Sequence, residues 1–212
     1  MSRARRPRAR RGEGDRLREE ILDAASGLLV STGSEDAVSI RAVADAVGVT
    51  PPSIYLHFAD KTDLVFAVCE EHFRRFDAEI EAAVAGSGGP VEELHVRARA
   101  YMEFGLQHPE EYRILFMTRP GHTAVGFGAE QVMDATAFIH LVDNVVRCRD
   151  AGLLRVDDEA VVSAMLWATV HGLTSLLIAK PDFPWPATPD VLLAQTLDVL
   201  DLGLLSDAAR RA

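Results

Sequence analysis

The chain has 212 residues, of which 48% are hydrophobic and 25% charged. This composition is that of a globular protein with one large or two small domains, and it excludes the fibrous and disordered classes. Two cysteines, Cys69 and Cys148, are too few for a disulfide framework, and neither has neighbours at zinc-ligand spacing. We therefore expect a cytoplasmic protein.

The formal charge of −10 is unevenly distributed along the chain. Residues 1–18 contain eight arginines and two acidic residues, whereas residues 19–212 contain 14 cationic and 30 acidic residues. A basic arm, which we assign to residues 1–14, thus precedes an acidic body. The asymmetry suits a protein that touches a polyanion at one end, although a solvated tail has the same composition. No apolar segment or cleavage site follows the arm, so we do not expect a secretory signal.

Apolar residues recur at helical rather than strand spacing along nearly the whole chain, which predicts an all-α fold of about nine helices. The expected helices lie at about 15–31, 40–47, 51–58, 61–85, 91–107, 109–117, 127–151, 158–179 and 189–206. Residues 160–179 have the length of a membrane span, but they include His171 and several hydroxyl side chains. We interpret this segment as a buried helix and expect no membrane partner.

Residues 39–58, SIRAVADAVGVTPPSIYLHF, have the pattern of two short helices joined by a tight turn at Gly48. Ser39 stands at the N-cap of the first helix. Thr50 stands at the N-cap of the second, and Pro51 occupies that helix's first position, where a missing N–H costs nothing. The apolar faces of both helices are expected to pack against the helix of residues 15–31. The pattern is that of a helix-turn-helix module.

The outer faces of this module carry side chains suited to phosphate contacts. They are Ser39, Arg41, Thr50, Ser53, Tyr55, His57 and Lys61. Pro51 and Pro52 stand where bases are read, and neither can donate a hydrogen bond. Base recognition should therefore depend on contact with thymine methyl groups and on DNA shape, with Arg41 and the arm as remaining donors. The same residues would also suit the ordinary surface of a three-helix domain.

Residues 33–68 resemble the DNA-binding signature of the TetR family of transcriptional regulators. The signature consists of a small or hydroxyl residue opening the domain's second helix, an Ala-x-x-x-Gly-Val-Ser/Thr turn, a Tyr-x-His-Phe motif and a Lys-x-x-Leu pair. Here these are Ser39, Ala44, Gly48, Val49, Thr50, Tyr55, His57, Phe58, Lys61 and Leu64. The resemblance covers about residues 15–75. It implies a sequence-specific DNA-binding regulator, most often a repressor, with a DNA-binding domain at 15–75 and a helical domain for dimerisation and ligand sensing at 76–212.

The remainder of the chain is consistent with such a second domain. HPEEYRILF at 108–116 and WATVHGLTSLLIA at 167–179 are similar to a C-terminal subclass with a Trp-His-Gly signature. The helices near 158–179 and 189–206 are apolar around much of their circumference, which favours a homodimer interface over the core of a monomer. A homodimer would read a palindromic operator in double-stranded DNA.

Soft and aromatic residues at helical spacing are candidates for an effector pocket, although stripes of this kind are also typical of an ordinary core. They are Tyr101, Met102, Phe104, Phe116, Met117, Phe138 and Trp167, with His171 and Thr174 as polar anchors. A mostly apolar cavity would select an apolar or amphipathic molecule.

Two other functions were weighed against a DNA-binding regulator. The histidines have no metal-ligand spacing, and the sequence has no nucleophile elbow, Walker loop or complete dinucleotide fingerprint, so we expect no catalysis, cofactor or metal. The second alternative is a helical interaction protein whose helix-turn-helix is only structural. That protein would show no salt-dependent binding to DNA.

Overall fold

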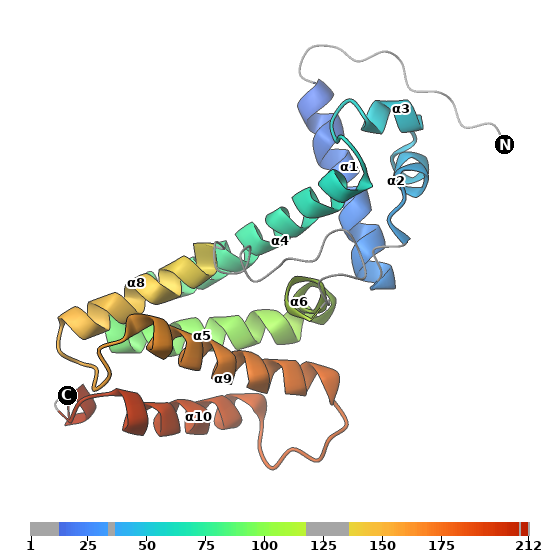
Figure 1. The fold of residues 1–212 in the computed structure, drawn as a ribbon. Helices are drawn as coiled ribbons and strands as arrows, with labels where there is room; N and C mark the ends of the chain where they lie inside the picture. Colours follow the sequence, from blue (N-terminus) through green and yellow to red (C-terminus); the bar gives the residue numbers. More distant parts are fainter. Residues whose placement is uncertain (1–12, 34–36, 118–135, 208, 212) are drawn as a thin grey trace. The chain divides into compact units, whose positions relative to one another are not determined.

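A computed structural model of the chain describes residues 13–33, 37–117, 136–207 and 209–211 (Figure 1). Apart from one isolated bridge between Leu154 and Leu205, the regular structure of these residues is helical. The helices are α1 (Glu13–Thr32), α2 (Ile40–Val47), α3 (Pro51–Ile54), α4 (Lys61–Val84), α5 (Pro90–Gln107), α6 (Pro109–Phe116), α8 (Thr136–Asp150), α9 (Glu159–Ala179) and α10 (Pro189–Leu204). The prediction of an all-α fold is confirmed.

Most helix ends lie within two residues of their expected positions. The clearest difference is α3, which was expected to reach residue 58 and ends at Ile54. The chain tightens there because the N–H groups of both His57 and Phe58 donate to the Ile54 carbonyl. The expected helix at 127–151 and the arm at 1–14 lie partly outside the described residues.

The chain divides into two compact units. The first contains the described residues of Met1–Phe73 and Glu110–Gly128, and the second contains those of Arg74–Pro109 and Ala129–Ala212. Residues of α4 therefore belong to both units, and most of α6 belongs to the first. From the sequence we placed the domain boundary at residues 75–76 and assigned all later residues to the second domain.

Helices α1 to α4 of the first unit share one apolar core. Its fully buried members include Ile21, Leu29, Val43, Ile54 and Leu64. Ser39 caps α2, because its Oγ accepts the N–H of Ala42 at 3.1 Å. Gly48 ends α2 with a φ of +79°, a left-handed conformation that glycine adopts at little cost. Ser39 thus begins α2, and Gly48 ends it and turns the chain toward α3.

A buried histidine ties α6 to the rest of the first unit. The Nδ1 of His72 in α4 lies 2.9 Å from Oε2 of Glu111 in α6, and its Nε2 lies 3.1 Å from Oγ of Ser26 in α1. The side chains of His72 and Glu111 are only 7% and 12% exposed. Ile114 of α6 also packs against the apolar core. These contacts connect α1, α4 and α6 within the first unit.

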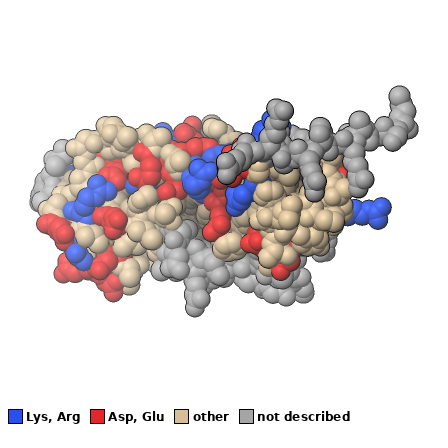
Figure 2. All heavy atoms as spheres, turned by 90° about the horizontal axis from the view of Figure 1, so that it is seen from above, with Lys and Arg blue, Asp and Glu red and all other residues tan. Residues whose placement is uncertain are grey.

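The second unit is built from α5, α8, α9 and α10, with the C-terminal part of α4. Its core includes Leu94, Val145, Val162 and Leu204, one from each of the four main helices. By length and composition α9 could cross a membrane. Six of its residues are nevertheless buried within the unit: Val162, Ser163, Val170, Thr174, Leu177 and Ile178. Acidic and basic side chains are interspersed over the second unit, at the left of Figure 2.

Candidate nucleic-acid interface and aromatic core

The α2–α3 module of the first unit carries the predicted DNA contacts. Ile54 of α3 and Phe58 of the following turn are 0% and 2% exposed in the core, so the opposite side of α3 faces outward. Pro51, Pro52 and Tyr55 are exposed on that side. In helix-turn-helix proteins this outward face of the second helix enters the major groove.

The predicted phosphate-contacting residues lie on α2, on α3, in the turn that follows α3 and at the start of α4. Ser39 and Arg41 are exposed at the start of α2, whereas Thr50, Ser53, His57 and Lys61 are half-buried. Thr50 occupies the N-cap position of α3 but makes no side-chain bond to its backbone, contrary to expectation. Its hydroxyl instead lies 3.2 Å from that of Ser53. The structure thus brings all nine predicted DNA-contacting residues into the first unit.

Arg18 of α1 lies next to the turn that follows α3, a placement that the sequence did not suggest. Its guanidinium lies 5.2 Å from the ring centroid of Phe58, which ends the turn of residues 55–58 after α3. The side chain is exposed. The basic character of residues 1–18 was visible in the sequence, but the contact of Arg18 with Phe58 joins residues 40 positions apart and has no local signal.

An aromatic cluster in the second unit contains several of the residues predicted to contact an effector. The hydroxyl of Tyr101 in α5 lies 2.9 Å from Nδ1 of His171 in α9, and Ser175 Oγ lies 3.2 Å from its Nε2. The Trp167 ring is 5.7 Å from His171 and 5.8 Å from Phe138 of α8, measured between centroids. A hydrogen-bonded imidazole therefore lies among aromatic rings from three helices.

Burial governs the charge of this imidazole. It lowers the pKa of His171, because the imidazolium cation loses hydration when it is buried. The ring is therefore neutral at neutral pH and can exchange one donor and one acceptor with Tyr101 and Ser175. The cluster contains a polar group with no net charge.

The other effector candidates are placed differently. Phe104 joins the cluster through Phe76, whose ring lies 5.0 Å from that of Phe104 and 5.3 Å from that of Tyr101. Met102 is fully buried, and so is Thr174, whose hydroxyl donates to the Val170 carbonyl at 2.8 Å. Phe116 and Met117 belong to the first unit, where Phe116 packs on Phe73.

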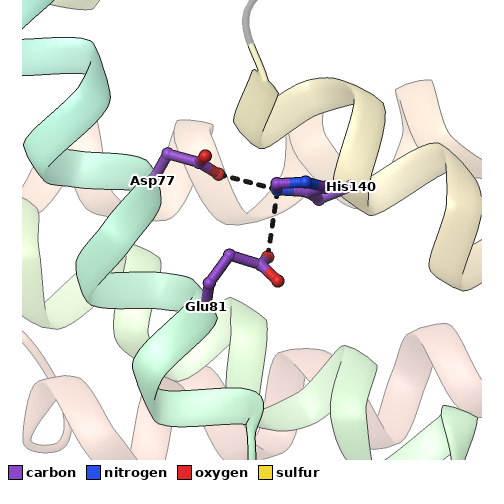
Figure 3. A group of neighbouring side chains, drawn as sticks. All are labelled: Asp77, Glu81 and His140. Carbon is purple, nitrogen blue, oxygen red and sulfur yellow. Dashed lines mark hydrogen bonds and ion pairs between the residues drawn. The ribbon is translucent and has the colours of Figure 1, made fainter.

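A charged cluster joins α4 to α8 and α5 in the second unit (Figure 3). Asp77 and Glu81 lie one turn apart on α4 and point toward Nδ1 of His140, at 2.9 and 3.2 Å. These three residues have the donor types of a cation site, but Arg97 donates to Glu81 at 2.6 Å and supplies the cluster with a positive charge. We therefore assign the cluster to ion pairing between helices. No local pattern predicts this cluster, because His140 is 59 residues from Glu81.

Arg97 extends this network to a second carboxylate, that of Glu93. Arg97 and Arg147 both donate to Glu93, at 3.1 and 2.6 Å. Burial raises the pKa of Glu93, but the hydrogen bonds from the two guanidinium groups outweigh it and hold that pKa below its ordinary value. The network thus keeps a largely buried carboxylate ionised within the α5–α8 contact.

Comparisons with known proteins agree with this arrangement. Residues 21–68 match the model of the bacterial regulatory proteins of the tetR family, and residues 94–200 match that of the tetracyclin repressor-like C-terminal domain. The chain is 27% identical over 160 residues to the HTH-type transcriptional activator FasR of Mycolicibacterium smegmatis, covering 72% of this chain and 73% of FasR.

Solved structures show the same fold. A protein of unknown function from Rhodococcus sp. RHA1 is 27% identical with a TM-score of 0.74, covering 90% of this chain and 96% of that one. The regulator FadR of Bacillus subtilis, solved in complex with stearoyl-CoA, is 14% identical with a TM-score of 0.69, covering 87% of this chain and 98% of FadR.

The fold and the outward-facing α3 define a helix-turn-helix transcription regulator of the DNA-binding type. One matched family model covers the helix-turn-helix of the first unit, and the other covers most of the second unit. The chain belongs to the TetR family.

We predict that Lys61→Ala weakens binding to duplexes of any sequence. One lost phosphate contact should reduce the slope of log K against log salt concentration by about one. Fluorescence anisotropy with a random-sequence duplex over a salt series measures this slope. Lys180→Ala is a matched control, because Lys180 is the chain's other lysine and lies at the end of α9. An unchanged slope in Lys61→Ala would contradict the phosphate contact.

The pKa of His171 predicts a pH dependence of stability. Its pKa is lower in the folded protein than its ordinary value of 6.5, so the unfolded chain binds more protons as the pH falls through 6.5. The free energy of unfolding should therefore fall as the pH falls below 6.5. In His171→Gln it should fall less over the same range, because glutamine does not titrate. Urea unfolding between about pH 7.5 and 5.5 measures it, with His57→Gln as a control for loss of an imidazole. A wild-type pH profile in His171→Gln would show that the site does not titrate this way.

Proposed function

We propose that this protein is a cytoplasmic transcriptional repressor that binds a palindromic operator as a homodimer and is released by an apolar or amphipathic ligand. The observation that carries the proposal is the α2–α3 module, with Ile54 buried and the other side of α3 open to solvent. The candidate phosphate contacts are Ser39, Arg41, Thr50, Ser53, Tyr55, His57 and Lys61, which lie on α2, on α3, in the turn that follows α3 and at the start of α4.

Exposed apolar residues on α9 and α10 support dimerisation. On α9, Val161, Met165 and Leu176 are 46%, 45% and 53% exposed, at helical spacings that place them along one side. On α10, Val199 and Leu202 are 68% and 61% exposed. Exposed apolar stripes on two consecutive helices of a monomer would be costly in water. A second copy covers them in a two-fold arrangement, in which the same surface of each subunit meets its equivalent.

A two-fold axis determines the kind of operator. Two copies of α3 related by such an axis read inverted half-sites, with centres about one helical turn or a multiple of it apart. A change in the separation of the two modules would therefore alter affinity without a change in any contacting residue. A ligand drives that change only through different affinities for the two states.

The aromatic cluster of the second unit is the proposed ligand site. Tyr101 and His171 supply a neutral hydrogen-bonding pair, and Phe138 and Trp167 supply apolar contacts. A site of this composition favours a ligand with a long apolar part and a polar group able to replace one partner of His171. FadR of Bacillus subtilis was solved in complex with stearoyl-CoA, an amphipathic molecule, which supports this class of ligand.

Repression is the mode we propose, since a dimer released by its ligand frees the DNA that it covered. FasR is named as an activator, so both modes of regulation occur among relatives of this chain. A reporter gene placed behind the selected operator distinguishes the two modes. Deleting the regulator raises expression for a repressor and lowers it for an activator.

We predict that the protein sediments as a dimer at micromolar concentration, and that Leu176→Arg with Leu202→Arg converts it to a monomer. Burying two additional charges per subunit without partners would cost more than the interface gains. Sedimentation velocity measures the outcome. Leu106→Arg, at a leucine of α5 that is 36% exposed, is the matched control and should remain a dimer. A wild-type monomer would contradict both the interface and the palindrome.

A further inference from the structure

The most exposed side chains of α3 and of the turn that follows it are apolar or aromatic. Pro51 and Pro52 are the first two residues of the helix. Tyr55 comes four residues after Pro51, and Leu56 comes four residues after Pro52. Tyr55 is 55% exposed and Leu56 is 82% exposed, the highest value among the large apolar side chains of the described residues. The N–H of Phe58 donates to the Ile54 carbonyl, which keeps residues 55–57 in a helical turn. Pro52 and Leu56 are therefore neighbours on one face.

Leu56 forms an exposed apolar patch together with Pro51, Pro52 and Tyr55. The core of the first unit takes Ile54 and Phe58 from the same short segment, and Leu56 points away from it. Replacing Leu56 by a polar residue would remove no core contact, so the fold does not require leucine at this position. Leu56 lies between Tyr55 and His57, two of the predicted DNA-contacting residues. A contact with DNA would therefore explain why a leucine stands at this exposed position.

The chemistry of this face limits what it can recognise in the major groove. Pro52 and Leu56 present only C–H groups, so they cannot pair with base donors or acceptors. The C5 methyl of thymine is the one apolar group that a base pair displays in the major groove. Against guanine or cytosine the same side chains would displace water from polar groups without replacing its hydrogen bonds. The face therefore discriminates in favour of thymine.

We infer that Leu56, together with Pro52, reads thymine methyl groups, so that each half-site carries an A·T pair beneath these two residues. The inference rests on the proposed function, because it requires that α3 enters the major groove. It assigns a role in specificity to Leu56, which is not one of the signature residues and makes no contact with the core. Tyr55, on the adjacent part of the face, retains a hydroxyl that can reach phosphate.

Deoxyuridine substitution tests the inference directly, because uracil pairs like thymine and lacks only the methyl group. The operator is first selected from a random duplex pool, and each thymine is then replaced in turn, with affinity measured by anisotropy. Loss of one methyl contact should weaken binding about fourfold in one half-site and about 15-fold when both half-sites are changed. Thymines outside the half-sites should show no effect.

Leu56→Ala assigns the effect to its residue. This variant should bind the thymine operator more weakly and should no longer distinguish thymine from uracil at the sensitive position. Leu106→Ala makes the same change at an exposed leucine of the second unit and should keep the full wild-type difference. Circular dichroism and thermal melting confirm that both variants are folded.

The possible failures are distinguishable. Specific binding that is insensitive to uracil at every thymine overturns the inference and leaves the proposed function standing. A uracil effect that persists unchanged in Leu56→Ala overturns the assignment to Leu56. If the pool yields no duplex bound above competitor DNA, the proposed function itself fails, and the inference fails with it.

Discussion

The order of α3 depends on the burial of Ile54 and Phe58 in the core of the first unit. A helix of four residues has no stability of its own, because nucleating a helical turn costs more than one hydrogen bond returns. Burial of two large side chains provides the free energy that holds α3 in place. Gly48, in the left-handed conformation, turns the chain between α2 and α3. Because Ile54 and Phe58 are buried, the other side of α3 faces the solvent.

The second unit follows a different constraint, since α9 and α10 have more apolar surface than their own unit covers. Part of α9 is buried against α5, α8 and α10, but Met165 and Leu176 remain about half exposed. The same unit contains a neutral histidine within aromatic rings. The proposed dimer and the proposed ligand site thus use separate surfaces of the same helix, which is a physical basis for coupling them.

Features that depend on neighbouring residues could be predicted from the sequence. The Ser39 cap, the turn at Gly48 and Pro51 at the start of α3 are local, and each lies where it was predicted. The long-range contacts could not be predicted, because residues 39 to 70 positions apart meet only in the folded chain. Examples are His72 with Glu111 and Tyr101 with His171, where both residues of the second pair were named but their hydrogen bond was not.

Sequence-specific binding by a dimer is the central claim, and selection of genomic fragments by the purified protein in excess competitor DNA tests it most directly. Footprinting of the selected fragments then shows the symmetry of the site. The account predicts one or a few sites, each with two inverted half-sites about one helical turn apart or a multiple of it. Fragments no better bound than the competitor, or protection of a single asymmetric site, would contradict it.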